Sequence, residues 1–267
     1  ANTRKAFASA FNQLEALVNP LKLSSMTTST LATFQRKLRA TGVRTTTVAS
    51  YLRSMKSALN WAKDVDLLTE VPRMRTPKGA ADCGMKGRAI VLEEHERMQA
   101  SVGKVVEAPY VPLWQYYLDG LWWSGLRLGE SMDLSWEPTS DVSVVLQPGY
   151  RPAIKFTVMG HKGRRAELTP CAPEFGLMLD AIPEDERTGF VFDLQATRRY
   201  AGRLAAATVG PLISEIGRAD GVIVNEQTGK PVSAHDYRRA FGTRWSKRLM
   251  PPRLMRHKKI DTTLKYY

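Results

Sequence analysis

The residues best suited to covalent chemistry lie at the end of the sequence, where His257 precedes Tyr266 by nine positions (266 − 257). A tyrosine phenol has a pKa near 10, so it is a weak nucleophile at neutral pH unless a base or cationic groups lie beside it. Residues 261–263, Asp-Thr-Thr, are typical of a helix start, which predicts that Tyr266 lies near the middle of a short final helix. The alternative is structural: Tyr266 and Tyr267 form an aromatic pair that closes a hydrophobic core.

A first arginine motif, Gly-Leu-Arg-Leu-Gly-Glu, spans residues 125–130 and places Arg127 three positions before Glu130. If Ser124 caps a helix here, both side chains lie on one face, and Glu130 orients a guanidinium toward phosphate oxygens. The neighbouring tryptophans at 122–123 favour a half-buried arginine, whose burial requires a partner. The alternative is a surface ion pair, which contributes little to stability.

A second basic motif, Ser-Ala-His-Asp-Tyr-Arg, spans residues 233–238. The Ser233 and Asp236 spacing is that of a capping box, so a helix is predicted to start here with His235 and Arg238 one turn apart on one side. Helix N-termini favour anions, which suits this pair to a phosphate. By itself the His-x-x-Arg pattern is common by chance.

A third basic cluster, residues 160–165, follows a predicted strand and contains Lys162. Basic residues at turns are usually only solvated. A lysine on a turn is also able to reach a DNA groove and protonate a leaving oxygen. His161 is interpreted as incidental.

The composition indicates a polyanionic partner. The 267 residues contain 39 Lys+Arg and 26 Asp+Glu, a net charge of +13, and the sequence pI is about 9.9. A basic domain of this kind favours nucleic acid, although charge alone does not separate an enzyme from a passive binder. No apolar run reaches membrane-spanning length, and two cysteines, Cys83 and Cys171, make no disulfide framework. A reducing, cytoplasmic setting is expected.

Helices are predicted throughout residues 1–72. Apolar residues recur at helical spacing from Ala6 to Leu17, Thr28 is a plausible N-cap for the next helix, and Gly42 ends that helix. A third helix, 45–63, carries the apolar stripe Val48, Leu52, Met55, Leu59 and Ala62. Its polar side carries Arg44, Arg53, Lys56 and Lys63, which form either a solvated face or a surface for DNA phosphates.

A stretch rich in Pro, Gly and basic residues, 73–87, has the composition of a linker. Beyond it the sequence predicts a helix near Glu93, a buried aromatic helix over 110–123 and a small antiparallel sheet within 141–170. Helices are then predicted from Pro173 to the end. The predicted fold class is mainly α, with an all-α first domain and an α+β second domain.

In this order, the site residues resemble those of the tyrosine recombinase (phage integrase) family: Arg127, Lys162, His235, Arg238, His257 and Tyr266. The stretch 256–266 is similar to the family's histidine-to-tyrosine segment, with Arg256 where glycine is more frequent. The resemblance covers nearly the whole chain. It implies a helical core-binding domain over 1–78, a linker over 79–87 and a catalytic domain over 88–267.

The resemblance also implies a mechanism. Arg127 and Arg238 clamp the scissile phosphate, His257 hydrogen-bonds to it, and His235 assists proton transfer around Tyr266. Tyr266 attacks phosphorus to give a 3′-phosphotyrosyl link, and Lys162 protonates the departing 5′-oxygen. Religation then needs neither ATP nor metal, so no cofactor is expected.

The implied partner is double-stranded DNA, synapsed by a homotetramer, with no membrane involvement. Arg44, Arg53 and Lys56 on the 45–63 helix are predicted to contact the duplex, with this helix in the major groove. A prokaryotic, phage or mobile-element origin is expected, with the protein on the nucleoid. Two alternatives remain open: a type IB topoisomerase-like enzyme and a non-catalytic architectural DNA-binding protein.

Overall fold

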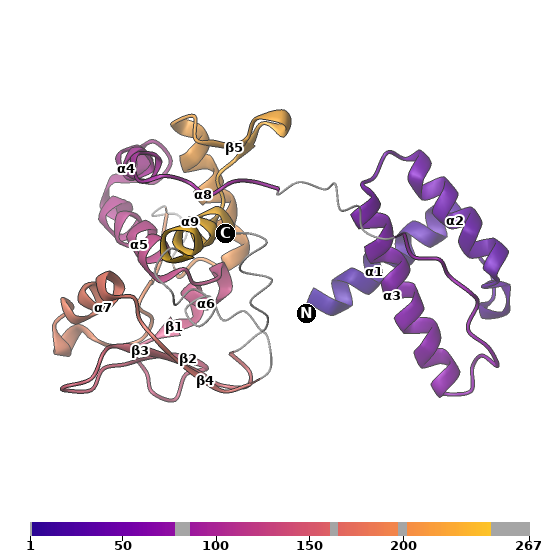
Figure 1. The fold of residues 1–267 in the computed structure, drawn as a ribbon, viewed down its shortest axis with the longest axis horizontal. Coiled ribbons are helices and arrows are strands. Elements are labelled where there is room, and N and C mark those ends of the chain that lie inside the picture. The colour runs from indigo at the N-terminus through magenta and orange to yellow at the C-terminus, as the bar shows by residue number, and fades with distance from the viewer. Residues whose placement is uncertain (1, 78–85, 161–164, 197–201, 247–267) are drawn as a thin grey trace. The chain divides into compact units, whose positions relative to one another are not determined.

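The computed structural model describes residues 2–77, 86–160, 165–196 and 202–246 (Figure 1). The chain divides into two compact units, Ala1–Gly84 and Met85–Tyr267. The division falls inside residues 79–87, for which the sequence predicts a linker.

The described part of the first unit is helical. Its elements are α1 (Asn2–Leu17), the short 3-10 turn η1 (Leu23–Ser25), α2 (Thr28–Ala40) and α3 (Thr45–Asp64). One detail of the prediction is wrong: Thr27 rather than Thr28 caps α2, because the Thr27 hydroxyl accepts the amide of Thr30 at 3.2 Å. Gly42, with a φ of 77°, follows the end of α2 as expected.

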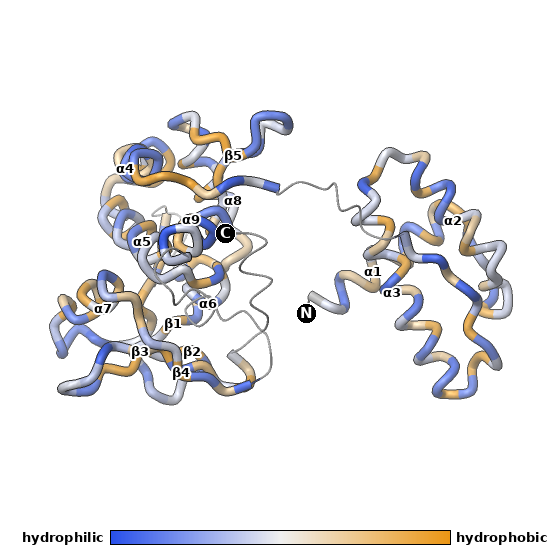
Figure 2. Tube along the Cα trace, viewed as in Figure 1, coloured by the Kyte–Doolittle hydropathy of each residue, from blue (hydrophilic) through white to orange (hydrophobic). Residues whose placement is uncertain are grey.

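The core of the first unit is formed by one face of each helix. Every residue of the stripe predicted for α3 is buried, and Leu31, Phe34 and Leu38 of α2 pack in the same cluster as most of it. Figure 2 shows hydrophobic and hydrophilic positions alternating along α2 and α3, the pattern of amphipathic helices.

The helices in the described part of the second unit enclose a larger core. They are α4 (Leu92–Ser101), α5 (Val111–Ser124), α6 (Leu128–Asp133), α7 (Pro173–Asp180), α8 (Ala206–Ala219) and α9 (Ala234–Ser246). Short 3-10 turns lie at Val102–Lys104, Ala108–Tyr110, Glu184–Glu186 and Glu226–Thr228. The aromatic helix predicted over 110–123 is α5, which buries Trp114, Tyr117 and Trp122 and packs against α9, α7 and α4.

The predicted antiparallel strands form β2 (Val142–Val145), β3 (Ala153–Phe156) and β4 (Glu167–Pro170). Val142 pairs with Phe156, and Ile154 pairs with Thr169, so the three strands form a meander. The sheet is nevertheless mixed, because the two-residue strand β1 (Leu134–Ser135) joins β2 in parallel. A strand of two residues is too short to show an alternation of apolar and polar positions, so the sequence did not indicate it.

The prediction of uninterrupted helices after Pro173 is wrong. A two-stranded antiparallel ribbon, β5 (Ile223–Asn225) and β6 (Lys230–Pro231), separates α8 from α9. The fold class is confirmed: the chain is mainly α, with a helical first unit and a second unit that combines helices with a small sheet.

Candidate active site

A hollow of about 510 Å³ in the second unit brings together three residues that the sequence predicts as catalytic. It lies where the start of α6, the middle of α8 and the start of α9 meet. Its lining consists of Arg127, Leu128, Gly210, Pro211, Ser214, Ser233, Ala234, His235 and Arg238. Residues more than 100 positions apart in the chain (238 − 127 = 111) therefore share one concave surface.

Arg127 is held in place by Glu130. Its Nη1 donates to Oε1 of Glu130 at 2.6 Å, and its backbone amide donates to Oε2 at 2.9 Å. Glu130 is buried, whereas the Arg127 side chain is about one-third exposed. Both carboxylate oxygens thus orient Arg127, which leaves the guanidinium partly open toward the hollow.

The predicted helix cap at Ser124 is wrong, because Arg127 occupies the N-cap position of α6. The Ser124 hydroxyl instead accepts the amide of Leu126 at 3.2 Å, within the turn that joins α5 to α6. The tryptophan pair at 122–123 also has a different arginine beside it. The guanidinium of Arg244 stacks 3.5 Å from the ring centre of Trp122 and donates to the Trp122 carbonyl.

Arg238 approaches the hollow from α9 and is almost fully buried, with 2% of its surface exposed. Its Nη1 donates a hydrogen bond to the carbonyl oxygen of Gly125. A buried guanidinium needs acceptors to offset its lost hydration, and this carbonyl supplies one. The bond ties the second predicted arginine to the turn that precedes the first.

Position 125 requires a glycine for two reasons, its backbone conformation and the closeness of a neighbouring side chain. Its φ is 61°, in the left-handed region, and a Cβ placed there collides with the ring of Phe241, which is itself buried. Gly125→Ala is therefore expected to destabilise the protein by about 2–4 kcal/mol, from left-handed strain and overpacking together. Urea unfolding followed by circular dichroism measures this change.

Gly129→Ala is the matched control for that prediction. Gly129 is an exposed residue inside α6, and a Cβ there meets no heavy atom within 4 Å. Alanine favours helix over glycine, so this variant is expected to be neutral or more stable by up to about 1 kcal/mol. Equal effects of the two substitutions would contradict the role given to Gly125.

The start of α9 carries the predicted Ser233–Asp236 cap in a modified form. The Asp236 carboxylate accepts the amide of Ser233 at 3.0 Å, as a capping box requires. The box is not completed in the usual way, because the Asp236 amide donates to the Ser233 carbonyl at 2.8 Å, while the Ser233 hydroxyl donates to the same carboxylate oxygen at 2.5 Å.

His235 lines the hollow beside these groups and is exposed. Partial desolvation by surrounding protein atoms lowers the pKa of its imidazole, and the positive charges of Arg239, Arg238 and Lys230 add to this, against the opposing effect of Asp236. The ring is therefore neutral at pH 7 and able to accept a proton.

This shift has a consequence for stability. Because the pKa is lower in the folded than in the unfolded chain, the unfolded chain binds more protons as the pH falls through 6.5, and stability decreases. His235→Gln is expected to reduce the difference between urea midpoints measured at pH 7.5 and pH 5.5. An unchanged difference would mean that His235 has the same pKa in both states.

The other three predicted catalytic residues, Lys162, His257 and Tyr266, lie outside the described residues. Their roles remain predictions. So does the cluster at 160–165 as a DNA-reaching turn, since only its two ends are described.

The residues predicted to bind DNA lie in the first unit. Arg44 occupies the N-cap position of α3, and Arg53 and Lys56 are exposed on its surface. The Arg53 Nε donates to the Ala49 carbonyl at 3.1 Å, which directs the side chain back along its own helix. Trp61, also in α3, is 61% exposed.

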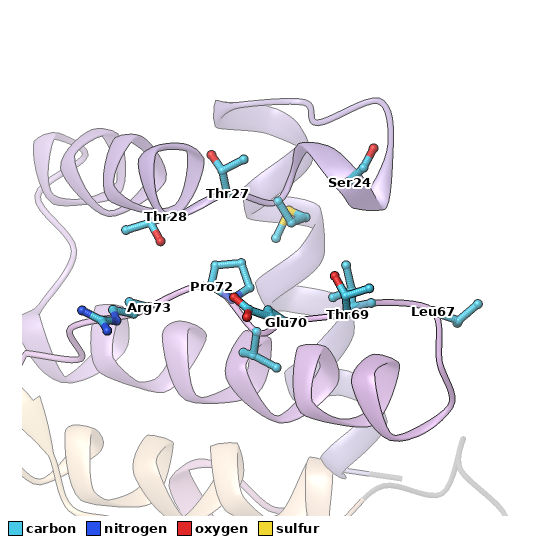
Figure 3. Close-up of a pocket in the computed structure, with 11 residues that line it drawn as sticks. Ser24, Thr27, Thr28, Leu67, Thr69, Glu70, Pro72 and Arg73 are labelled. Atoms are coloured by element: carbon cyan, nitrogen blue, oxygen red, sulfur yellow. The ribbon is translucent and has the colours of Figure 1, made fainter.

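A second hollow, of about 670 Å³, lies in the first unit between the start of α2 and the segment 67–73 (Figure 3). Glu70 and Arg73 are the charged residues among those that line it, and none of the predicted site residues does. It therefore lacks the two arginines and the histidine that line the first hollow.

The described residues contain neither a membrane-spanning helix nor a metal-binding cluster. No helix in them is long and apolar enough to cross a membrane. No group of three or more His, Cys, Asp or Glu side chains in the same ranges is arranged to hold a metal ion.

No protein-family model matches the chain, and no curated protein sequence matches it. Solved structures do. The integrase of transposon Tn1549, in complex with transposon right end DNA, superposes with a TM-score of 0.67 at 17% identity, covering 100% of this chain and 89% of that one. A lambda integrase dimer bound to a COC′ core site gives 0.66 at 15% identity, covering 97% and 86%.

A third solved structure is the XerH site-specific recombinase bound to a palindromic difH substrate, in a post-cleavage complex. It gives a TM-score of 0.65 at 16% identity, covering 98% of this chain and 75% of that one. Identities this low show the fold alone. The chain has the fold of the core-binding and catalytic domains of tyrosine recombinases, as the resemblance in the sequence implied.

Proposed function

We propose that the protein is a site-specific DNA recombinase that cuts and rejoins duplex DNA through a 3′-phosphotyrosyl intermediate. The observation that carries the proposal is the convergence of Arg127, His235 and Arg238 on one hollow of a unit with this fold. A fold alone does not specify an activity, so the proposal depends on these side chains.

The hollow suits a backbone phosphate. Arg127 and Arg238 bring two guanidinium groups from α6 and α9, and each is fixed by a hydrogen bond to the protein. Fixed cationic donors stabilise the charge that grows on the non-bridging oxygens as phosphorus becomes five-coordinate, without reorganising during the reaction.

The remaining steps follow from residue chemistry. The Tyr266 phenol loses its proton, with neutral His235 assisting the transfer, and attacks phosphorus. The bond between phosphorus and the 5′-oxygen breaks, and Lys162 gives that oxygen a proton. His257 donates a hydrogen bond to the phosphate. The phosphotyrosyl ester retains the bond energy, so a 5′-hydroxyl of another strand restores the backbone and releases Tyr266.

Duplex DNA is the proposed partner, with synapsis by a homotetramer. The net charge of +13 and the exposed cationic residues of α3 support contact with DNA phosphates. Two of the superposed integrases were solved on DNA, and the lambda integrase as a dimer.

The test is trapping of the covalent intermediate. Duplexes selected for binding from a randomised pool are nicked one to three positions from each candidate cut, so that the short downstream strand diffuses away after cleavage. A labelled strand that stays attached to the protein in denaturing gels, with phosphotyrosine after hydrolysis, is the expected result. Binding without an adduct on any selected duplex would favour a non-catalytic binder, and relaxation of plasmids lacking the selected sequence would favour a topoisomerase.

A further inference from the structure

The carboxylate of Asp236 is the most completely enclosed charge at the site, with 0% of its residue surface exposed. Its Oδ2 accepts from Lys230 Nζ at 2.7 Å, from the Ser233 amide at 3.0 Å and from the Ser233 hydroxyl at 2.5 Å. Its Oδ1 accepts a hydrogen bond from Nη1 of Arg239. A carboxylate with this many hydrogen-bond partners holds its surroundings in one arrangement. In the sequence, Asp236 stands between two residues that line the hollow, His235 and Arg238.

The chain approaches this carboxylate closely where it enters the second unit. Gly87 is buried, and a Cβ at this position would lie 2.5 Å from Asp236 Oδ1 and 2.8 Å from Lys230 Nζ. A side chain larger than that of glycine would therefore force the Asp236 carboxylate or its partner to shift. Because this contact joins residues 149 positions apart (236 − 87), no local sequence pattern predicts it.

The residue after Gly87 fixes the approach. The Arg88 amide donates to the Val224 carbonyl at 3.0 Å, and its Nη2 donates to the Ile223 carbonyl at 3.1 Å. The same guanidinium pairs with both oxygens of Glu94, at 2.7 and 2.5 Å. The backbone at Gly87 is thus held against β5 and α9.

We propose that Asp236 is a positioning residue that directs His235 and Arg238 into the hollow, and that Gly87 is the backbone contact that keeps its carboxylate in place. The catalytic part of this inference rests on the proposed function. The direct effect of Asp236 on His235 does not, because it is measurable in the protein without DNA.

The charges around His235 make that effect measurable. The charged residues that face the imidazole belong to three elements. α9 contributes Arg238, Arg239 and Asp236, and β6 contributes Lys230. Arg127, at the start of α6, lines the same hollow. Arg88 lies near Asp236 as well. Asp236 is the negative charge among those acting on the imidazole, so its removal leaves the cations unopposed and favours the neutral ring.

The first turn of α9 also has an anchor that does not depend on Asp236. Tyr237 is fully buried, its hydroxyl lies 3.3 Å from Nδ1 of His95 and 3.4 Å from the Met98 sulfur, and its ring packs edge-on against Trp122. We therefore expect Asp236→Asn, which keeps the volume and some hydrogen bonds, to fold.

The experiment compares Asp236→Asn with Asp220→Asn. Asp220 is a matched control, since it also pairs with an arginine and a lysine, Arg97 and Lys104, but lies at the end of α8 outside the hollow. Imidazole titrations by NMR, assigned through His235→Gln, are expected to show a lower midpoint for His235 in Asp236→Asn and no change in Asp220→Asn.

Adduct formation on the selected nicked duplex gives the second measurement. Asp236→Asn is expected to slow adduct formation roughly 10- to 100-fold, since small displacements of catalytic groups have effects of this size. In a plot of the rate against pH, the fall in rate on the acid side is also expected to move to lower pH. A variant that was only less stable would form the adduct more slowly without a change in the pH at which the rate falls. Asp220→Asn is expected to keep both the wild-type rate and the wild-type pH profile.

Gly87→Ala tests the backbone contact and replaces Asp236→Asn if that variant does not fold. It is expected to slow adduct formation at least about 10-fold, whereas Gly103→Ala, where a Cβ has only an ordinary 3.7 Å neighbour, keeps the rate. A wild-type adduct rate in Asp236→Asn or in Gly87→Ala would overturn the proposal. If wild-type protein forms no adduct, the proposed recombinase fails separately, and the His235 titration still decides whether Asp236 acts on His235.

Discussion

Tyr266→Phe is expected to abolish the covalent DNA adduct, whereas Tyr267→Phe leaves it intact. The ring is retained in both variants, so packing changes little, and each loses one hydroxyl. Removing a nucleophile costs on the order of 10³-fold or more in rate, which takes the adduct below detection on denaturing gels. The two adjacent tyrosines therefore form an internal control, and the spacing of nine from His257 selects the first of them.

The pair of variants also separates binding from chemistry. Tyr266→Phe is expected to bind the selected duplex as tightly as wild-type protein, because DNA phosphates account for most of the affinity and neither variant changes a charge. An adduct that persists in Tyr266→Phe and disappears in Tyr267→Phe would reassign the nucleophile. Its persistence in both would place the covalent link elsewhere.

Arg238→Lys is expected to reduce the rate of adduct formation by about 10²- to 10³-fold while the protein stays folded. The guanidinium is planar and has five N–H donors, of which Nη1 already serves the Gly125 carbonyl. A lysine ammonium has its three donors on one nitrogen, so it does not reproduce a planar fork whose separate nitrogens serve the carbonyl and the phosphate. Single-turnover cleavage under saturating protein measures the effect.

Arg218→Lys is the matched control for this substitution. Arg218 is exposed near the end of α8, outside the hollow, and its replacement is expected to change the rate less than twofold. Cleavage by Arg238→Lys at the wild-type rate would show that Arg238 holds the Gly125 turn and does not bind the phosphate.

The sequence predicted the features that depend on neighbours in the chain. The buried stripe of α3 was visible because Val48, Leu52, Met55 and Leu59 recur at helical spacing. The strands β2 to β4 were visible as branched runs between turns. The order of the site residues along the chain was sufficient to indicate the fold. Their arrangement in space was not predicted.

What the sequence did not predict depends on contacts between distant residues. The ribbon of β5 and β6 has three and two residues, too few for periodicity to reveal. The carbonyl of Gly125 as partner of Arg238, and the approach of Gly87 to Asp236, join segments more than 100 positions apart. The stacking of Arg244 on Trp122 is a third example, since these two residues lie 122 positions apart.

The Gly125 turn gives the site a fixed length as well as a fixed shape. One residue ends α5, accepts the hydrogen bond from Arg238, and stands two positions before Arg127. The separation of the two guanidinium groups therefore depends on a short covalent path, on the hydrogen bond from Arg238 and on the contacts with Glu130 that orient Arg127. Inserting or deleting a single residue between 125 and 127 would therefore put the two arginines out of register, so the length of this turn is constrained as well as its sequence.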